Sequence, residues 1–261
     1  MRLYLEVARL SFRRHLAYRA ATIAGLFTNS VFGVLIAAVF TALYRDRAGD
    51  VAGFSLPEAL TFVWASQSLI TFAALWGWWE IATAIKTGDV VADLMKPFSF
   101  QGYWLSRDLG RAACHFLLRM LPTFLVGGLF YDLALPRSPL TWLAVAPSLV
   151  LAVVVSFGWR FVLNLSAFWL LDHRGISSIA VLVVNFFSGF LVPLAFFPPE
   201  LRAVTNLLPF RAIVMLPIEI LLGQRAVAPA LGIQLFWAVA LALLAQAVLA
   251  SAVRKVVIQG G

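Results

Sequence analysis

The chain of 261 residues is 62% hydrophobic and only 12% charged, about half the charged share of an ordinary soluble domain. This composition excludes a soluble globular protein and predicts an integral membrane protein. The formal net charge of +8 would suggest a nucleic-acid partner for a soluble protein, but here it reports the side of the bilayer on which Lys and Arg lie, so we expect no nucleic-acid partner.

Runs without charged residues predict six membrane-spanning helices. A helix needs roughly 20 mostly apolar residues to cross the hydrocarbon core; five runs of that length lack Asp, Glu, Lys and Arg, and a sixth is interrupted only by Arg119. With the N-terminus inside, twelve of the twenty Lys and Arg residues fall on the inner side and six on the outer side, which predicts cytosolic N- and C-termini. The spans are expected at residues 20–43, 58–84, 111–131, 141–171, 176–195 and 227–253.

Residues 2–19 predict an amphipathic helix at the membrane interface. Charged residues recur along one stripe of this helix at spacings of four, three and four: Arg2, Glu6, Arg9 and Arg13. Such a helix lies in the headgroup region, with its cations toward anionic lipid or a cytosolic partner. Arg9 and Arg13 are therefore candidates for partner contact, and a simple positively charged anchor is the alternative.

The stretch IKTGDVVADLMKP at 85–97 separates the predicted second and third spans. Four charged residues fall at spacings of three, four and three, which places them on one face of a helix: Lys86, Asp89, Asp93 and Lys96. Apolar residues take the opposite face: Val90, Val91, Leu94 and Met95. Thr87 is the expected N-cap and Pro97 the expected stop. The pattern predicts a short cytosolic helix over residues 86–97, with a plain structural loop as the alternative.

Residues 196–224 are apolar but repeatedly interrupted by proline. The pieces between prolines are too short to cross a bilayer, so we expect a re-entrant hairpin of two short helices on the outer side. Irregular backbone at membrane depth requires cover by protein or by a water-filled cavity. No internal repeat or linker divides the sequence, which predicts a single transmembrane domain over residues 1–261.

Three charged residues within the predicted spans are candidates for a translocation path, because intramembrane charge is costly and often functional. Arg160 lies about ten residues from the inner end of its span and needs a partner or a wet cavity; it could contact an anionic substrate or form a structural ion pair. Arg119 could extend to the inner surface. Glu80 could pair with either arginine or lie at the interface.

Signatures of catalysis and cofactor binding are missing from the sequence. No GxxxxGK[ST] phosphate loop occurs, so the chain cannot hold ATP by that device. The three histidines, His15, His115 and His173, are scattered and none belongs to HExxH. No GxSxG elbow is present. We therefore predict no catalytic residue, metal site or cofactor in this chain.

The stretch at 85–97 resembles a motif that follows the second span in bacterial ABC-2 type transporter permeases. Further resemblances follow in order along the chain: SAFWLL at 166–171, FFSGFLVPLAFFP at 186–198, LPF at 208–210, LPIEILLG at 216–223 and VIQGG at 257–261. Together they cover most of the chain from about residue 81 onward. The first 80 residues resemble the family in layout more than in wording.

The resemblance implies the membrane half of an ABC exporter with the type V exporter fold, located in the bacterial cytoplasmic membrane. It also implies that residues 86–97 dock on a separate ATPase, which holds ATP and Mg, and that a second permease of the same or a related sequence completes the path. The residues expected to contribute to ATPase coupling are Lys86, Gly88, Asp89, Val90, Asp93, Leu94, Lys96, Pro97, Arg9 and Arg13.

Two other classes of function are weighed against an ABC exporter. A secondary transporter or channel driven by an ion gradient would be expected to show inverted repeats, broken midplane helices and paired carboxylates, and the sequence shows none of these. An intramembrane enzyme lacks candidate residues. The presence of a neighbouring gene for an ATPase would favour the exporter.

Overall fold

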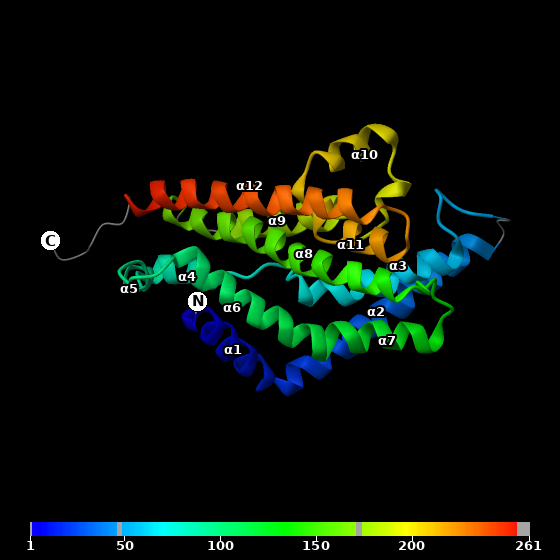
Figure 1. Cartoon of the computed structure of the whole chain (residues 1–261), viewed down its shortest axis with the longest axis horizontal. Helices are drawn as coiled ribbons and strands as arrows, with labels where there is room; N and C mark the ends of the chain where they lie inside the picture. The colour runs from blue at the N-terminus through cyan, green and yellow to red at the C-terminus, as the bar shows by residue number, and fades with distance from the viewer. Residues whose placement is uncertain (1, 46–48, 171–173, 255–261) are drawn as a thin grey trace.

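The computed structural model describes residues 2–45, 49–170 and 174–254. Over these ranges the fold is all-helical apart from one isolated bridge, which confirms the predicted all-α class. Long helices run side by side along the longest axis of the molecule (Figure 1). The predicted motif at 257–261 and His173 lie outside the described residues.

Twelve α-helices and four short 3-10 or π turns follow one another in the described part of the chain. Their bounds are α1 Arg2–Leu16, α2 Arg19–Arg45, α3 Leu56–Phe72, α4 Glu80–Thr87, α5 Val90–Leu94, α6 Phe100–His115, the π turn η1 Phe116–Met120, α7 Leu121–Phe130, α8 Pro139–Leu165, η2 Ser166–Phe168, α9 Arg174–Phe187, η3 Leu194–Phe196, α10 Pro199–Asn206, η4 Pro209–Ala212, α11 Met215–Leu221 and α12 Val227–Val253.

Four helical stretches in the described residues are long and apolar enough to cross a membrane: Arg19–Arg45, Phe100–Phe130, Pro139–Phe168 and Val227–Val253. They correspond to the predicted first, third, fourth and sixth spans, although the third begins at Phe100 rather than at residue 111. The predicted fifth span contains a shorter helix, because α9 ends at Phe187. The chain is thus a multi-pass helical membrane protein, and the number six remains a prediction.

The predicted continuous helix over residues 58–84 is wrong. α3 ends at Phe72 and helix resumes only at Glu80, and Gly77 in the intervening segment has a φ of +89°. A left-handed residue cannot continue an α-helix, and glycine adopts this conformation without steric cost. Because the run LWGWW is uncharged, a search for gaps between charges could not reveal this break, which comprises residues 73–79.

The N-terminal helix α1 covers most of the predicted range 2–19 and packs along α6. Gly110 of α6 lies so close to α1 that a Cβ added there would be 2.0 Å from the carbonyl oxygen of Ala8. The Ser11 hydroxyl donates a hydrogen bond of 2.6 Å to the Arg107 carbonyl. One side of α1 is therefore committed to protein contact, and its placement in the headgroup region remains a prediction.

Residues 196–224 contain the short helices α10 and α11, joined through η4. α11 is buried along its whole length. Its Glu219 carboxylate forms ion pairs with Arg211 at 2.6 Å and with Arg225 at 3.0 Å. These contacts neutralise an acid that the apolar sequence around it would otherwise leave uncompensated. The re-entrant character of this hairpin remains a prediction.

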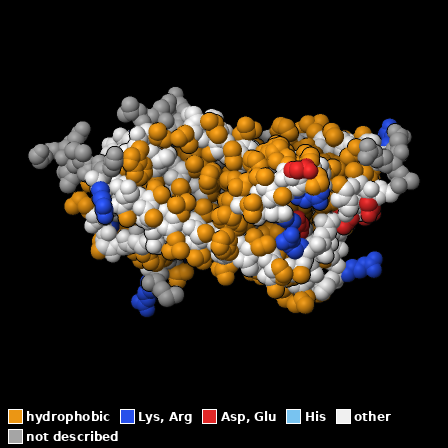
Figure 2. Space-filling model, turned by 90° about the horizontal axis from the view of Figure 1, so that it is seen from above, with side chains coloured by type: hydrophobic (Ala, Val, Ile, Leu, Met, Phe, Trp, Pro, Cys, Tyr) orange, Lys and Arg blue, Asp and Glu red, His pale blue; other side chains and the backbone are white. Residues whose placement is uncertain are grey.

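The two ends of the molecule carry different elements. The N-terminus, α4, α5 and the C-terminal end of α12 lie toward one end of the long axis, which we call the α5 end (Figure 1). α10, α11 and the start of α3 lie toward the other, the α10 end. In Figure 2, hydrophobic side chains cover the middle of the visible face and charged side chains lie mostly toward its ends. This distribution is the one expected of a protein surrounded by lipid.

Candidate coupling segment and the buried charges behind it

The predicted coupling segment, residues 86–97, is a bent pair of helices and not one helix. α4 ends at Thr87, and Gly88 follows as a left-handed C-cap with a φ of +82°. Such a glycine is a common helix stop, and it prevents the charged residues from lining a single helical face. Asp89 occupies the N-cap position of α5, and its carboxylate accepts a 2.6 Å hydrogen bond from the Thr87 hydroxyl. α5 ends at Leu94, before Pro97.

The candidate coupling residues differ in exposure. Most are exposed, namely Lys86, Gly88, Asp89, Lys96 and Pro97 on the segment and Arg9 and Arg13 on α1. Asp93 and Leu94 are half-buried, and Val90 is buried at 2% exposure. Val90 thus belongs to the core, and the exposed residues of the segment lie at the surface.

Two ion pairs order the exposed charges. Lys96 donates a 2.6 Å hydrogen bond to the Asp93 carboxylate, and this bond raises the pKa of the Lys96 ammonium group above its usual value. On α1, Arg9 lies 3.4 Å from Glu6. Both pairs are close in sequence and exposed, so each contributes little to stability.

A small apolar cluster supports α5 from behind. Its buried members come from α4, α5, α6, α8 and α12: Ile81, Val90, Phe100, Trp104, Phe157, Phe161, Leu165 and Ala245. Burial of these side chains holds α5 in place, because each large apolar side chain that is fully buried stabilises the folded state by roughly 1.5–3 kcal/mol. The coupling segment is therefore packed against three long helices at the α5 end.

Asn164 of α8 fastens the chain on both sides of the start of α4. Its Oδ1 accepts a 2.9 Å hydrogen bond from the Ala82 amide, and its Nδ2 donates to the Trp78 carbonyl at 2.8 Å. The side chain is fully buried. No local pattern predicts this role, because Ala82 and Trp78 lie 82 and 86 residues from Asn164 along the chain.

Glu80 opens α4 and connects it to α6 and α1. Its carboxylate forms an ion pair with Arg107 at 2.5 Å and lies 3.9 Å from the Arg14 guanidinium. The prediction that Glu80 pairs with Arg119 or Arg160 is therefore wrong. Arg107 belongs to α6, which begins at Phe100 and therefore before the predicted start of the third span at residue 111.

A buried ionic cluster lies where α6 meets α8. Asp108 of α6, 2% exposed, accepts hydrogen bonds from Arg111 Nε at 2.8 Å and from Arg160 Nη2 at 2.7 Å. Arg160 Nε also donates to the Ser156 hydroxyl at 3.2 Å. Arg160, at 3% exposure, thus has a protein partner for its charge. The role of Asp108 could not be predicted from the sequence, because its partner Arg160 lies 52 residues away on another helix.

The same cluster closes the open end of α3. Arg111 donates to the carbonyl oxygens of Thr71 at 2.5 Å and of Phe72 at 3.0 Å. The Ser156 hydroxyl donates to the Ala73 carbonyl at 2.5 Å. The last carbonyls of a helix lack intrahelical partners, and here α6 and α8 supply them. The break within the predicted second span is therefore held by side chains of neighbouring helices.

Arg119 lies on the π turn η1 and extends across α2. A Cβ added to Gly25 would lie 2.0 Å from Arg119 Nη2. The structure also brings two of the histidines together, with the ring centroids of His15 and His115 5.5 Å apart. Among the described residues, no three His, Cys, Asp or Glu side chains converge as metal ligands would.

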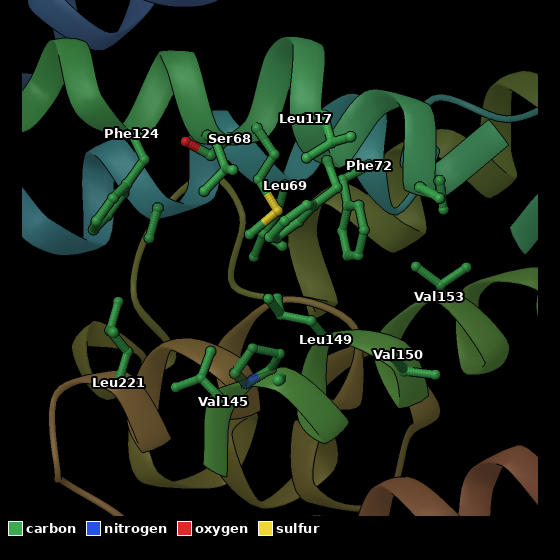
Figure 3. A pocket seen from close by; sticks show the side chains of 18 of the residues that line it. Ser68, Leu69, Phe72, Leu117, Phe124, Val145, Leu149, Val150, Val153 and Leu221 are labelled. Atoms are coloured by element: carbon green, nitrogen blue, oxygen red, sulfur yellow. The ribbon is translucent and has the colours of Figure 1, made fainter. Parts of the chain in front are cut away.

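A cavity of about 540 Å³ lies between α3, the α6–α7 helix, α8 and α11. Figure 3 shows Leu69, Phe72 and Leu117 on one side of it, facing Val145 and Leu149 of α8 on the other. Its lining is apolar almost throughout. None of the three charged path candidates lines this cavity, and their role in translocation remains a prediction.

Comparison with known families gives one finding. The sequence profile described as ABC-2 family transporter protein matches residues 31–260, which is most of the chain. Comparison with curated proteins and with solved structures gives no significant match. The matched range includes the break at 73–79, the predicted coupling segment, the buried ionic cluster and the α10–α11 hairpin. The chain therefore belongs to the ABC-2 family of transporter proteins.

Proposed function

We propose that this membrane subunit of an ABC transporter is the permease of an ATP-driven exporter in the bacterial cytoplasmic membrane. Family membership supports a transport role. The sequence contains no phosphate loop, so ATP and Mg belong to separate ATPase subunits. In this proposal both termini are cytosolic, six spans cross the membrane, and a second permease of the same or a related sequence encloses the other half of the path.

The observation that carries the proposal is the exposed α4–α5 bend and its attachment to the rest of the helical bundle. Gly88 and Asp89 are exposed at its tip, whereas Val90 is buried behind it. A segment that is exposed on one side and packed on the other can receive force from a partner and pass it on. We therefore assign ATPase docking to this bend.

The contacts of α4 indicate which helices would move when an ATPase displaces the α4–α5 bend. Asn164 ties α4 to α8, and the Glu80–Arg107 pair ties it to α6. The break at 73–79 means that no continuous helix joins α4 to α3. In the proposed mechanism, displacement of α5 by an ATPase therefore moves α6 and α8 first.

One observation favours the ion-driven alternative. A broken helix is typical of secondary transporters, and the second span is broken. However, the buried acid nearest the break, Asp108, is already paired with two arginines, so it is not an open cation site. A strict requirement of transport for ATP and an ATPase partner would reject this alternative.

The test is reconstitution with an ATPase that carries a phosphate loop and copurifies with the permease. The variant Asp93→Ala/Leu94→Ala should weaken ATPase binding by about tenfold or more, as expected for loss of a central interface contact, without impairing membrane insertion. Glu200→Ala on α10, at the opposite end, is the matched control. Undiminished ATPase binding and transport in the double variant would overturn the assignment of the bend.

A further inference from the structure

A second cavity, of about 210 Å³, lies at the corner between α1 and α2. Its lining combines basic, aromatic and small side chains from α1, α2, α4, α6 and η1: Arg14, His15, Tyr18, Ala21, Thr22, Glu80, His115 and Arg119. Neither the ATPase-docking bend nor the large apolar cavity uses this site. Its chemistry is that of a small anion-binding pocket.

The positive charge of the pocket is only partly balanced by the protein. Glu80, the acid in the lining, is shared between Arg107, at 2.5 Å, and the lining residue Arg14, at 3.9 Å. Arg119 forms no ion pair with a described carboxylate, and its Nε is buried without a hydrogen-bond partner. His115 Nδ1 is likewise buried without a partner. Buried polar groups of this kind call for a ligand or ordered water.

The position of the Arg119 side chain is built into the neighbouring helix. The guanidinium lies across Gly25, where any Cβ would overlap it. Its own backbone is the π turn η1, and single π turns within α-helices frequently occur at functional sites. Gly25 on α2 leaves room for the Arg119 guanidinium, and the π turn η1 carries its backbone. Together they place the positive charge of Arg119 at this pocket.

We propose that this pocket binds a phosphate group. Arginine matches phosphate oxygens with paired N–H donors and remains charged, and His115 can donate a further hydrogen bond. His15 already donates through Nδ1 to the Ser11 carbonyl at 2.8 Å, so that N–H is not available to a phosphate. Arg119 and His115 are therefore the donors around a space large enough for one tetrahedral anion.

The surroundings favour a membrane phospholipid as the source of the phosphate. On α2, exposed apolar side chains begin immediately after Thr22, with Ile23 at 68% and Phe27 at 70% exposure. Acyl chains can lie along this surface while the headgroup phosphate occupies the pocket. Basic pockets between membrane helices bind phosphorylated headgroups in this way. Free inorganic phosphate has the same chemistry and is distinguished by experiment.

The test uses the full-length protein in nanodiscs that contain phosphatidylglycerol and monogalactosyldiacylglycerol, a neutral lipid without phosphate. After extraction into mild detergent, native mass spectrometry measures the ratio of the two lipids that stay bound. Arg119→Gln removes the cation, and Gly25→Ala displaces it while α2 gains a better helix former. Arg2→Gln, at an exposed position of α1 outside the pocket, is the matched control for loss of one positive charge.

We expect the unmodified protein to retain phosphatidylglycerol preferentially. Arg119→Gln and Gly25→Ala should each reduce that preference by about tenfold, the loss expected for one charge-assisted contact, and Arg2→Gln should leave it unchanged. Thermal melting of each variant verifies folding, and Gly25→Ala retains the test if Arg119→Gln does not fold. Arg119-dependent stabilisation by inorganic phosphate without lipid preference would assign free phosphate. Equal lipid ratios in all four proteins, with no effect of phosphate, would overturn the proposal.

Discussion

Asp108 of α6 and Arg160 of α8 form an ion pair of 2.7 Å, with both side chains almost fully buried. The carboxylate also accepts a hydrogen bond from Arg111, which in turn holds the end of α3. One acid thus links α6, α8 and, through Arg111, the end of α3. Because of these contacts, we expect replacement of Asp108 to weaken the packing of several helices at once.

Replacement of Asp108 by Asn should destabilise the protein strongly. Two arginines would remain buried without a counter-charge, and removal of one partner from a buried pair costs about 3–5 kcal/mol. Unfolding in mixed micelles of mild detergent and dodecyl sulfate measures the change in free energy. Asp93→Asn, in the exposed pair with Lys96, is the control and should cost about 1 kcal/mol or less. Similar losses for both variants would contradict the role of the buried cluster.

Replacement of Asn164 by Ala should uncouple the ATPase without preventing its binding. The variant removes the hydrogen bonds to Ala82 and Trp78, at a cost of about 1–3 kcal/mol for the groups left unpaired. The proposed docking surface on α5 stays intact. The expected result is normal ATPase copurification with reduced transport per ATP hydrolysed. Asn206→Ala, exposed on α10, should show normal transport; a normal result for Asn164→Ala as well would exclude α8 from the path of force.

Replacement of Gly88 by Ala should impair coupling through backbone strain. The native φ of +82° costs a non-glycine residue about 1–2 kcal/mol, so the bend between α4 and α5 should shift. We expect weaker stimulation of the ATPase by the reconstituted permease. Gly175→Ala, in a helix with open space around the added methyl, is the control. If the Gly88 variant stimulates the ATPase as well as the control does, the bend has no special geometric role.

Replacement of Gly110 by Ala should detach α1 from α6. The added Cβ would meet the backbone of Ala8, and backbone cannot move aside as a flexible side chain can. Hydrogen exchange along α1 should therefore become faster, by up to the factor of about ten that corresponds to 1.4 kcal/mol. Gly232→Ala, which meets nothing within 4 Å on α12, should leave the exchange unchanged. Protection of α1 in both variants would contradict the close packing.

The long, uninterrupted helices were predictable from the sequence. Runs without charge are sufficient to identify α2, α8 and α12, because each such run must span lipid or be buried. The bounds of α12 agree with the predicted range 227–253. Pattern alone also located the segment around Gly88, although the glycine divides it into two helices. The long helices and the segment around Gly88 depend on hydropathy and on helix-breaking residues such as glycine and proline. Both can be read from a short stretch of sequence.

Features that depend on distant partners were not predictable. Asp108 meets Arg160 only because α6 and α8 pack together, and its local sequence resembles any cytosolic charged stretch. Asn164 has a role only in relation to Trp78 and Ala82, which belong to another part of the chain. The break at 73–79 is apolar and therefore invisible to hydropathy. For Asp108 and Asn164 the determining contact arises from tertiary packing.

In the proposed mechanism, the interruption at 73–79 also limits how far movement travels from one end of the molecule to the other. A single helix from Leu56 to Thr87 would tilt as one body, so any displacement of its Thr87 end would reach its Leu56 end. Two shorter helices need not move together. Movements near Gly88 would then be taken up by neighbouring helices while the surroundings of Leu56 stay in place, so that an exporter built in this way would keep one end closed while the other end moves.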